Sequence, residues 1–209
     1  MTLSQVRIVD AAVELLARVG LDGLTLRKLA GELGVSAPTL YWHVDSKRHL
    51  LDLMVEEIYG RADVCSEPAP GEPWWQWLAS NARAQRQALL SVRDAALVVA
   101  GNRPTERSLP FLERTLGSLL QAGVDSATGL RLLRSLNDYV IGSAIEYQSM
   151  MAREPEPARD ASTALAVRTS PDYPLVQAAL NSTEESLETI FEAGLQWFIG
   201  GVRADLAAR

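Results

Sequence analysis

Apolar residues recur every three or four positions along almost the whole chain, which is the spacing of an α-helix with one buried face. No short run alternates cleanly between apolar and polar side chains, so the pattern predicts no strand. We therefore expect an all-α fold.

The first part of the chain predicts four helices, each preceded by a serine or threonine that can cap its N-terminus. The third is very short and carries a proline in its first turn, where a missing N–H is tolerated. The predicted boundaries are Ser4 to Gly20, Thr25 to Gly34, a short helix after Ser36, and Ser46 to about Ala62.

Prolines between Cys65 and Pro73 interrupt the helical pattern and predict a joint. Three units follow from this: a helix-turn-helix domain at 1–46, a connecting helix and joint at 47–72, and a helical regulatory and dimerisation domain at 73–209. In the last unit we expect helices at Trp74–Ser91, Arg107–Gln121, Asp125 or Ser126 to about Met151, Pro174–Leu180 and about Thr183 to Ala207, with a break at Gly101 and a mobile loop at Arg153–Tyr173.

The second and third predicted helices are joined by a short turn, which fits a helix-turn-helix. Leu40 and Val44 are four residues apart and can pack on the second helix, whereas Thr39, Trp42 and His43 share the opposite face. An exposed tryptophan needs a partner. The major groove of DNA admits a helix and would supply one.

Cationic and phenolic groups surround this face. Tyr41 lies at its flank, and Lys47 opens the next helix with Arg48, where each could reach a phosphate. Arg27 lies in the second helix and could reach a phosphate or a guanine edge. The alternative is that Trp42 and Tyr41 pack in a core and the charges are solvated surface.

Charge is unevenly distributed over the 209 residues, whose net charge is −6. Residues 1–50 hold six basic and five acidic side chains, whereas the remainder holds 14 basic and 21 acidic ones. A mildly basic end on an acidic body is expected when only that end meets a polyanion, although random surface variation gives the same pattern.

The lone cysteine, Cys65, excludes a disulfide framework and a multi-thiolate metal site and fits a reducing cytoplasm. No apolar run is long enough for a membrane span, and the first residues do not read as a signal peptide. We expect a cytoplasmic, nucleoid-associated protein.

Motifs along most of the chain carry a resemblance to a known family. In the first part they are Leu24-Thr25-Leu26-Arg27-Lys28-Leu29-Ala30, Leu33-Gly34-Val35, Pro38-Thr39-Leu40-Tyr41-Trp42-His43-Val44, Lys47-Arg48 and Leu50-Leu51-Asp52. Further along they are Leu89-Leu90-Ser91, Arg93-Asp94, Gly101, Arg103-Pro104-Thr105-Glu106 and Gln121-Ala122-Gly123. The chain thereby resembles the TetR family of bacterial regulators. The resemblance weakens after Met150.

The resemblance implies that eight residues of the helix-turn-helix meet DNA: Arg27, Ala37, Pro38, Thr39, Tyr41, Trp42, His43 and Lys47. Ala37 stands where tetracycline-responsive members have a base-reading glutamine, and Leu26 where they have a threonine. We therefore expect a different operator sequence, with Ala37 able to contact a thymine methyl.

The resemblance also implies a small-molecule site between helices. Its expected walls are Trp77, Asn81, Gln85, Val99, Arg103, Pro104, Leu112, Thr115, Leu116, Leu133, Asn137 and Glu146. For each of these residues simple core packing is the alternative, and for the leucines it is the favoured one.

Tetracycline-responsive members chelate their drug through magnesium with two histidines. The matching positions here hold Asp63 and Val99, and an aromatic pocket residue is replaced by Gln85. We expect no metal, no cofactor and no magnesium–tetracycline inducer, but an uncharged or partly apolar ligand. A hard cation held through oxygen by Asp63 or Glu146 is the open alternative.

The predicted helices at 126–151 and 183–207 are apolar nearly all round, which is more than packing on one domain requires. Pairing of both with their copies would form a homodimer with a four-helix interface. Its two DNA-binding ends would then face successive major grooves about 34–36 Å apart. Burial inside one large monomer is the alternative.

Together these features predict a ligand-responsive transcriptional repressor that binds a palindromic operator and is released by a small molecule. A transcriptional activator and a small-molecule binding module without operator DNA are the alternatives. An enzyme is not expected, because both histidines, His43 and His49, lie in the DNA-binding end and no nucleophile or phosphate-binding motif is present. Only carboxylate chemistry would remain open to it.

Overall fold

The computed structural model describes residues 3–62, 64, 67–69, 71–101, 106–154, 157–182 and 186–208. All regular structure in these ranges is helical, so the expected all-α fold is confirmed. The elements are α1 (Gln5–Gly23), α2 (Leu26–Leu33), α3 (Ala37–Tyr41), α4 (Lys47–Arg61), α5 (Trp74–Ser91), α6 (Ala95–Val99), the 3-10 turn η1 (Glu106–Ser108), α7 (Leu109–Gln121), α8 (Ser126–Ala152), α9 (Pro157–Thr169), α10 (Pro174–Ser182) and α11 (Leu187–Ala207). Within the described part, no helix is both long and apolar enough to cross a bilayer.

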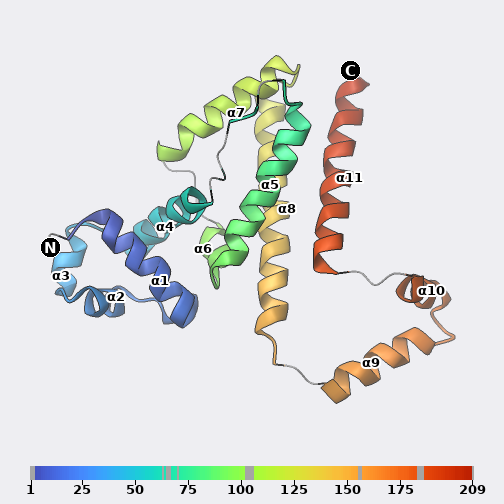
Figure 1. Ribbon diagram of the computed structural model, residues 1–209, viewed down its shortest axis with the longest axis horizontal. Helices are drawn as coiled ribbons and strands as arrows, with labels where there is room; N and C mark the ends of the chain where they lie inside the picture. Colours follow the sequence, from blue (N-terminus) through green and yellow to red (C-terminus); the bar gives the residue numbers. More distant parts are fainter. Residues whose placement is uncertain are drawn as a thin grey trace.

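Helices α1 to α3 and the start of α4 form a small head at one end of the molecule (Figure 1). The four predicted caps are confirmed: Ser4, Thr25, Ser36 and Ser46 each accept a hydrogen bond from the backbone N–H three residues ahead, at 3.1 to 3.3 Å. Gly34 ends α2 in the left-handed conformation, with φ of +66°, which glycine adopts without strain.

The body is built on α5 and α8, which pack along one another at its centre (Figure 1). Helix α7 covers α8, α11 packs on both α5 and α8, and α6 lies at the end nearest the head, where it touches α4 and α1. Helix α4 leads out of the head and also packs on α5. It is therefore one of the mechanical links between the two parts.

Helices α9 and α10 pack on each other and project beyond the end of α8 as an arm (Figure 1). The expected loop at Arg153–Tyr173 is thus wrong, since α9 occupies most of it. Pro157 is the first residue of α9, where its missing N–H is not needed, so proline there starts a helix rather than preventing one.

Several elements differ from the prediction. Helix α7 begins at Leu109 rather than Arg107, and α10 ends at Ser182 rather than Leu180. Gly20 does not end α1: it kinks the helix with φ of +71°, and α1 continues to Gly23. Helix α6 was not predicted. It is separated from α5 by a turn in which Asp94 has a φ of +59°. Helix α11 begins at Leu187 after the cap Ser186, later than the expected Thr183, which lies outside the described residues.

Candidate DNA interface and ligand site

Helix α3 packs against the rest of the head on one side and is exposed to solvent on the other. Leu40 and Val44 are fully buried, as expected, while Trp42 is 88% exposed and Tyr41 52% exposed. The alternative in which these two rings pack in a core is therefore wrong. A protein that leaves an indole almost entirely in water has a surface suited to a partner.

The remaining side chains of α3 are less uniform. Thr39 is exposed, and its hydroxyl lies 2.8 Å from that of Ser36, which fixes the start of the helix. Pro38 is exposed and Ala37 half-buried. His43 is half-buried as well, so only Trp42 meets the expectation of a fully outward ring.

The cations near α3 divide into two groups. Arg27 and Lys47 are exposed, and the Lys47 ammonium donates to the Leu21 carbonyl at 3.3 Å. That carbonyl offsets the cost of placing a cation at the start of α4. Arg48 instead turns to the body, where it donates to the Gly101 carbonyl at 2.6 Å and lies 3.7 Å from the Asp52 carboxylate. Arg48 is therefore held away from α3, against our expectation.

A polar cluster joins three helices at the expected ligand site. The Gln85 amide on α5 donates to the Asn137 carbonyl oxygen on α8 at 2.6 Å. It also donates to the Tyr59 hydroxyl on α4 at 2.9 Å. The structure thus brings two predicted residues together and adds Tyr59, which the sequence pattern did not single out.

One face of α5 continues this cluster toward α7. Trp77, Asn81 and Gln85 are spaced four residues apart and share that face. The Trp77 ring is buried, with its centroid 6.4 Å from that of Phe111 on α7. Asn81 donates to the Trp77 carbonyl at 3.0 Å, while its own carbonyl oxygen is buried without a hydrogen-bond partner in the described structure. A buried, unpaired acceptor is a place where a ligand donor would be stabilising.

The other predicted wall residues fall in several places. Val99 is buried on α6, and Thr115 is fully buried on α7, where its hydroxyl donates to the Phe111 carbonyl of its own helix at 2.9 Å. Leu112, Leu116 and Leu133 are half-buried on α7 and α8. Glu146 is exposed and lies half a turn round α8 from Asn137, so it does not join the cluster within one chain. Arg103 and Pro104 lie outside the described residues, as does Asp63.

Metal-binding groups do not gather in the described part of the chain, where no three His, Cys, Asp or Glu side chains come together. Val99, at one of the two positions where magnesium-chelating members have histidine, is an aliphatic side chain with no ligand atom. At this position the residue present does not fit the metal-binding histidine that the resemblance implies.

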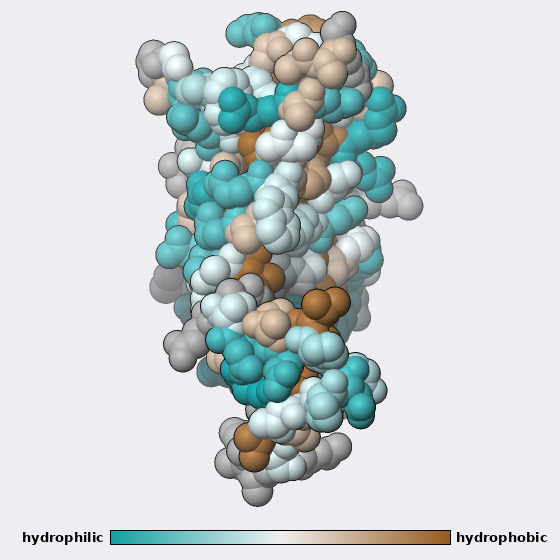
Figure 2. All heavy atoms as spheres, turned by 90° about the vertical axis from the view of Figure 1, so that its right-hand side faces the viewer, coloured by the Kyte–Doolittle hydropathy of each residue, from teal (hydrophilic) through white to brown (hydrophobic). Residues whose placement is uncertain are grey.

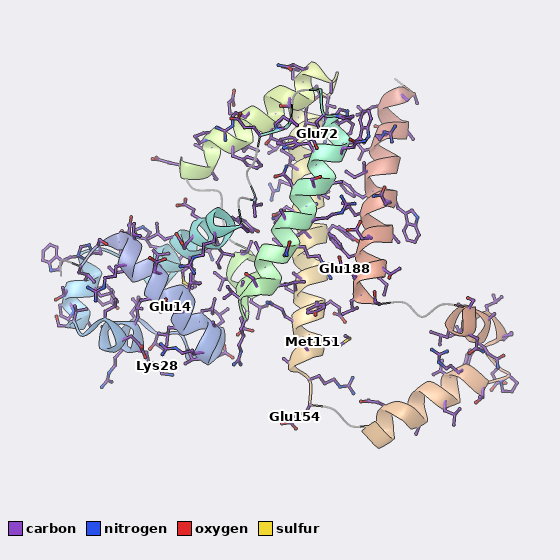
Figure 3. All side chains as sticks on the ribbon, in the orientation of Figure 1. Glu14, Lys28, Glu72, Met151, Glu154 and Glu188 are labelled. Carbon is purple, nitrogen blue, oxygen red and sulfur yellow. The ribbon has the colours of Figure 1, made fainter. Side chains whose placement is uncertain are left out.

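Two further contacts were not foreseen. The Leu21 backbone N–H of α1 donates to the Asp94 carboxylate at 2.8 Å and so ties the head to the start of α6. Arg86 is buried in the body, donating to the Ser143 hydroxyl at 3.1 Å and pairing with Glu188. Glu188, labelled in Figure 3, lies at the start of α11. The Arg86 guanidinium also lies 4.5 Å from the Phe191 ring centroid. Neither contact is visible in the sequence, because each partner is more than 50 residues away.

Comparison with known proteins agrees with this arrangement of head and body. Residues 8–54 match the family described as bacterial regulatory proteins, tetR family. Residues 67–206 match the tetracyclin repressor-like C-terminal domain. The chain belongs to the TetR family. Its expected role as a transcriptional regulator is confirmed by both matches.

Individual relatives extend over nearly the whole length. The tetracycline repressor protein class D of Escherichia coli is 38% identical over 211 residues, which cover 99% of this chain and 92% of that protein. ActR of Streptomyces coelicolor without ligand superposes with a TM-score of 0.86 at 27% identity, covering 100% of this chain and 99% of its own. ActR in complex with actinorhodin gives 0.85 at 28% identity, with 97% and 96% covered. The named relatives are regulators rather than enzymes.

Proposed function

We propose that this TetR-family chain is a ligand-responsive repressor that binds a palindromic operator as a homodimer. A small molecule that is neither tetracycline nor its magnesium chelate releases it. The repressor activity of the tetracycline repressors and the ligand complex of ActR support this assignment.

The observation that carries the proposal is the exposure of Trp42. A short helix with Leu40 and Val44 buried holds this indole in water, beside the exposed Tyr41 and Lys47. A hydrophobic group so placed gains a partner when α3 enters a major groove, while the phenol and the ammonium can reach phosphates.

Exposed apolar side chains on the body support pairing of two copies. Trp197 on α11 is 78% exposed, and Ile190 on the same helix is exposed too, as are Leu130, Met150 and Met151 on α8. Figure 2 shows hydrophobic residues distributed down the face on which α11 lies. Such a surface on two adjacent helices favours a symmetric helical interface.

The chemistry of the polar cluster supports an uncharged ligand. Asn81, Gln85 and Asn137 offer amides, Tyr59 offers a hydroxyl, and Trp77 with Phe111 offers aromatic surface. Amides and aromatic rings suit a neutral molecule that carries carbonyl or hydroxyl groups. The ligand would act on the operator-binding equilibrium only to the extent that it prefers one arrangement of the two heads.

Selection of bound duplexes from a random pool tests the proposal. We expect an inverted repeat whose half-sites are about one helical turn apart, bound by two chains in a gel shift. Recovery of no enriched sequence, or of a single half-site bound by one chain, would overturn it.

Release of the protein from the selected duplex then tests the ligand class. Tetracycline with magnesium is expected to leave the complex intact, whereas a neutral inducer from a compound library should lower the operator affinity. Release by tetracycline only when magnesium is present would contradict this part.

A further inference from the structure

Gln85 is the side chain through which the ligand cluster touches the connecting helix. Its amide nitrogen has two hydrogens, and both are used: one points to Tyr59 on α4 and one to Asn137 on α8. We propose that Gln85 is a relay residue that holds α4 to the body and releases it when a ligand replaces Gln85 at Asn137. This inference rests on the proposed function and names the route by which the ligand would act on the head.

The position of Tyr59 explains how its hydrogen bond with Gln85 could affect the head. Tyr59 lies in the last turn of α4, while the other end of α4 begins directly after α3 and carries Lys47. A helix transmits a displacement along its length because its backbone hydrogen bonds keep it rigid. A change at Tyr59 therefore alters the placement of the head relative to α5.

A bound ligand could compete for both hydrogen bonds of the Gln85 amide. A ligand hydroxyl or N–H that donates to Asn137 occupies the acceptor that now orients Gln85. A ligand carbonyl beside Gln85 competes with the Tyr59 hydroxyl for the second amide hydrogen. Neither exchange requires a charge, which fits the neutral side chains of the cluster.

Two variants remove the contact from opposite sides. Tyr59→Phe keeps the ring and deletes only the hydroxyl, whereas Gln85→Leu deletes the amide. Gln76→Leu is the matched control, because Gln76 lies on the same helix, is exposed and, among the described residues, lines no surface shared with α4. The double variant Tyr59→Phe, Gln85→Leu shows whether both changes remove one shared interaction.

Hydrogen exchange of the α4 backbone in the full chain is the first measurement. We expect Tyr59→Phe and Gln85→Leu each to speed exchange in the last two turns of α4 by about twofold to tenfold, the range of one hydrogen bond. The double variant should exchange no faster than the faster single variant, and Gln76→Leu should match the parent. Unchanged exchange in Tyr59→Phe, or a double variant equal to the product of the two, would overturn the relay.

Affinity for the selected duplex is the second measurement. Each single variant is expected to raise Kd by about twofold to tenfold, since α4 must be reordered on binding, and the double variant should raise it no further. If the parent binds no duplex while α4 exchange still changes, the repressor assignment fails and the link to α4 stands. If the parent binds and neither quantity moves, the relay fails and the repressor assignment stands.

Discussion

The Asp94 carboxylate accepts a hydrogen bond from the Leu21 backbone N–H at 2.8 Å, which joins the kinked end of α1 to the first turn of α6. Asp94 holds this position in the left-handed region, with φ of +59°, at a cost of about 1 kcal/mol or more for a residue other than glycine. Gly20 has φ of +71° beside the same carboxylate. The junction is thus strained on the body side, at Asp94, whereas the head side uses a glycine, which adopts a positive φ without strain.

Gly20→Ala is expected to destabilise this junction. An added Cβ would lie 2.7 Å from the Asp94 carboxylate oxygen, and the positive φ would strain alanine in any surroundings. We expect a loss of about 2 kcal/mol in the free energy of unfolding, measured with urea. The control is Gly31→Ala in α2, where nothing lies within 4 Å of the added methyl group. That variant should be as stable as the parent or more so, and equal stability of both variants would contradict the account.

Gly194→Ala is expected to disturb the packing of α11. The added Cβ would lie 2.3 Å from the hydroxyl oxygen of Tyr139, which now donates to the Phe191 carbonyl at 2.7 Å. Overpacking of this kind costs about 1 to 3 kcal/mol. The melting temperature should fall, and Tyr139→Phe in the same chain should restore part of it by removing the closest atom. A melting temperature unchanged by Gly194→Ala would show that α11 does not pack as described.

The ion pair between α5 and α11 predicts a pH dependence. Arg83 donates twice to Glu192, at 2.7 and 2.8 Å, and so holds the pKa of that carboxyl below its usual 4.5. A lowered pKa means that the ionised form stabilises the fold, so this contribution is present above pH 4.5 and is lost as the pH falls through the lower folded value.

Glu192→Gln tests this dependence. Because the side chains of Arg83 and Glu192 are 41% and 34% exposed, we expect a loss of only about 0.5 to 1 kcal/mol at pH 7. The loss should shrink progressively below pH 4.5 when urea unfolding is repeated there. Glu113→Gln, at an exposed site on α7, is the control and should show no such trend. A constant difference between Glu192→Gln and the parent from pH 7 downward would rule out the ion pair as its source.

Trp197→Asp is expected to convert the proposed dimer to a monomer. A carboxylate on the exposed face of α11 would be buried against its copy, where an unpaired charge is costly. Sedimentation velocity should give half the parent's mass for Trp197→Asp and the parent's mass for Leu120→Asp, an exposed leucine on α7. A parent that sediments as a monomer, or a Trp197→Asp variant that stays dimeric, would remove α11 from the interface.

Local signals in the sequence were sufficient for most of the fold. Ser4, Thr25, Ser36 and Ser46 cap the helices that they were expected to cap, since capping depends on residues only three positions apart. The burial of Leu40 and the exposure of Trp42 also follow from a single short helix. Such features depend on the local sequence and not on contacts with distant parts of the chain.

Features that depend on distant partners could not be predicted in this way. Asp94 takes a positive φ in a contact with Leu21, 73 residues away, and nothing near Asp94 in the sequence indicates it. Tyr59 enters the ligand cluster only because α4 packs on α5. Helix α9 was missed for a different reason, because the prolines of its segment were interpreted as helix-breaking although Pro157 begins the helix.

The affinity of Trp42→Ala for the selected duplex tests the central claim most directly. Because the indole is 88% exposed, its removal should leave the melting temperature unchanged. If α3 lies in the major groove, Kd should rise about tenfold or more, the equivalent of losing one good base contact. A Trp42→Ala, His43→Ala variant that binds this duplex as tightly as the parent would contradict the account.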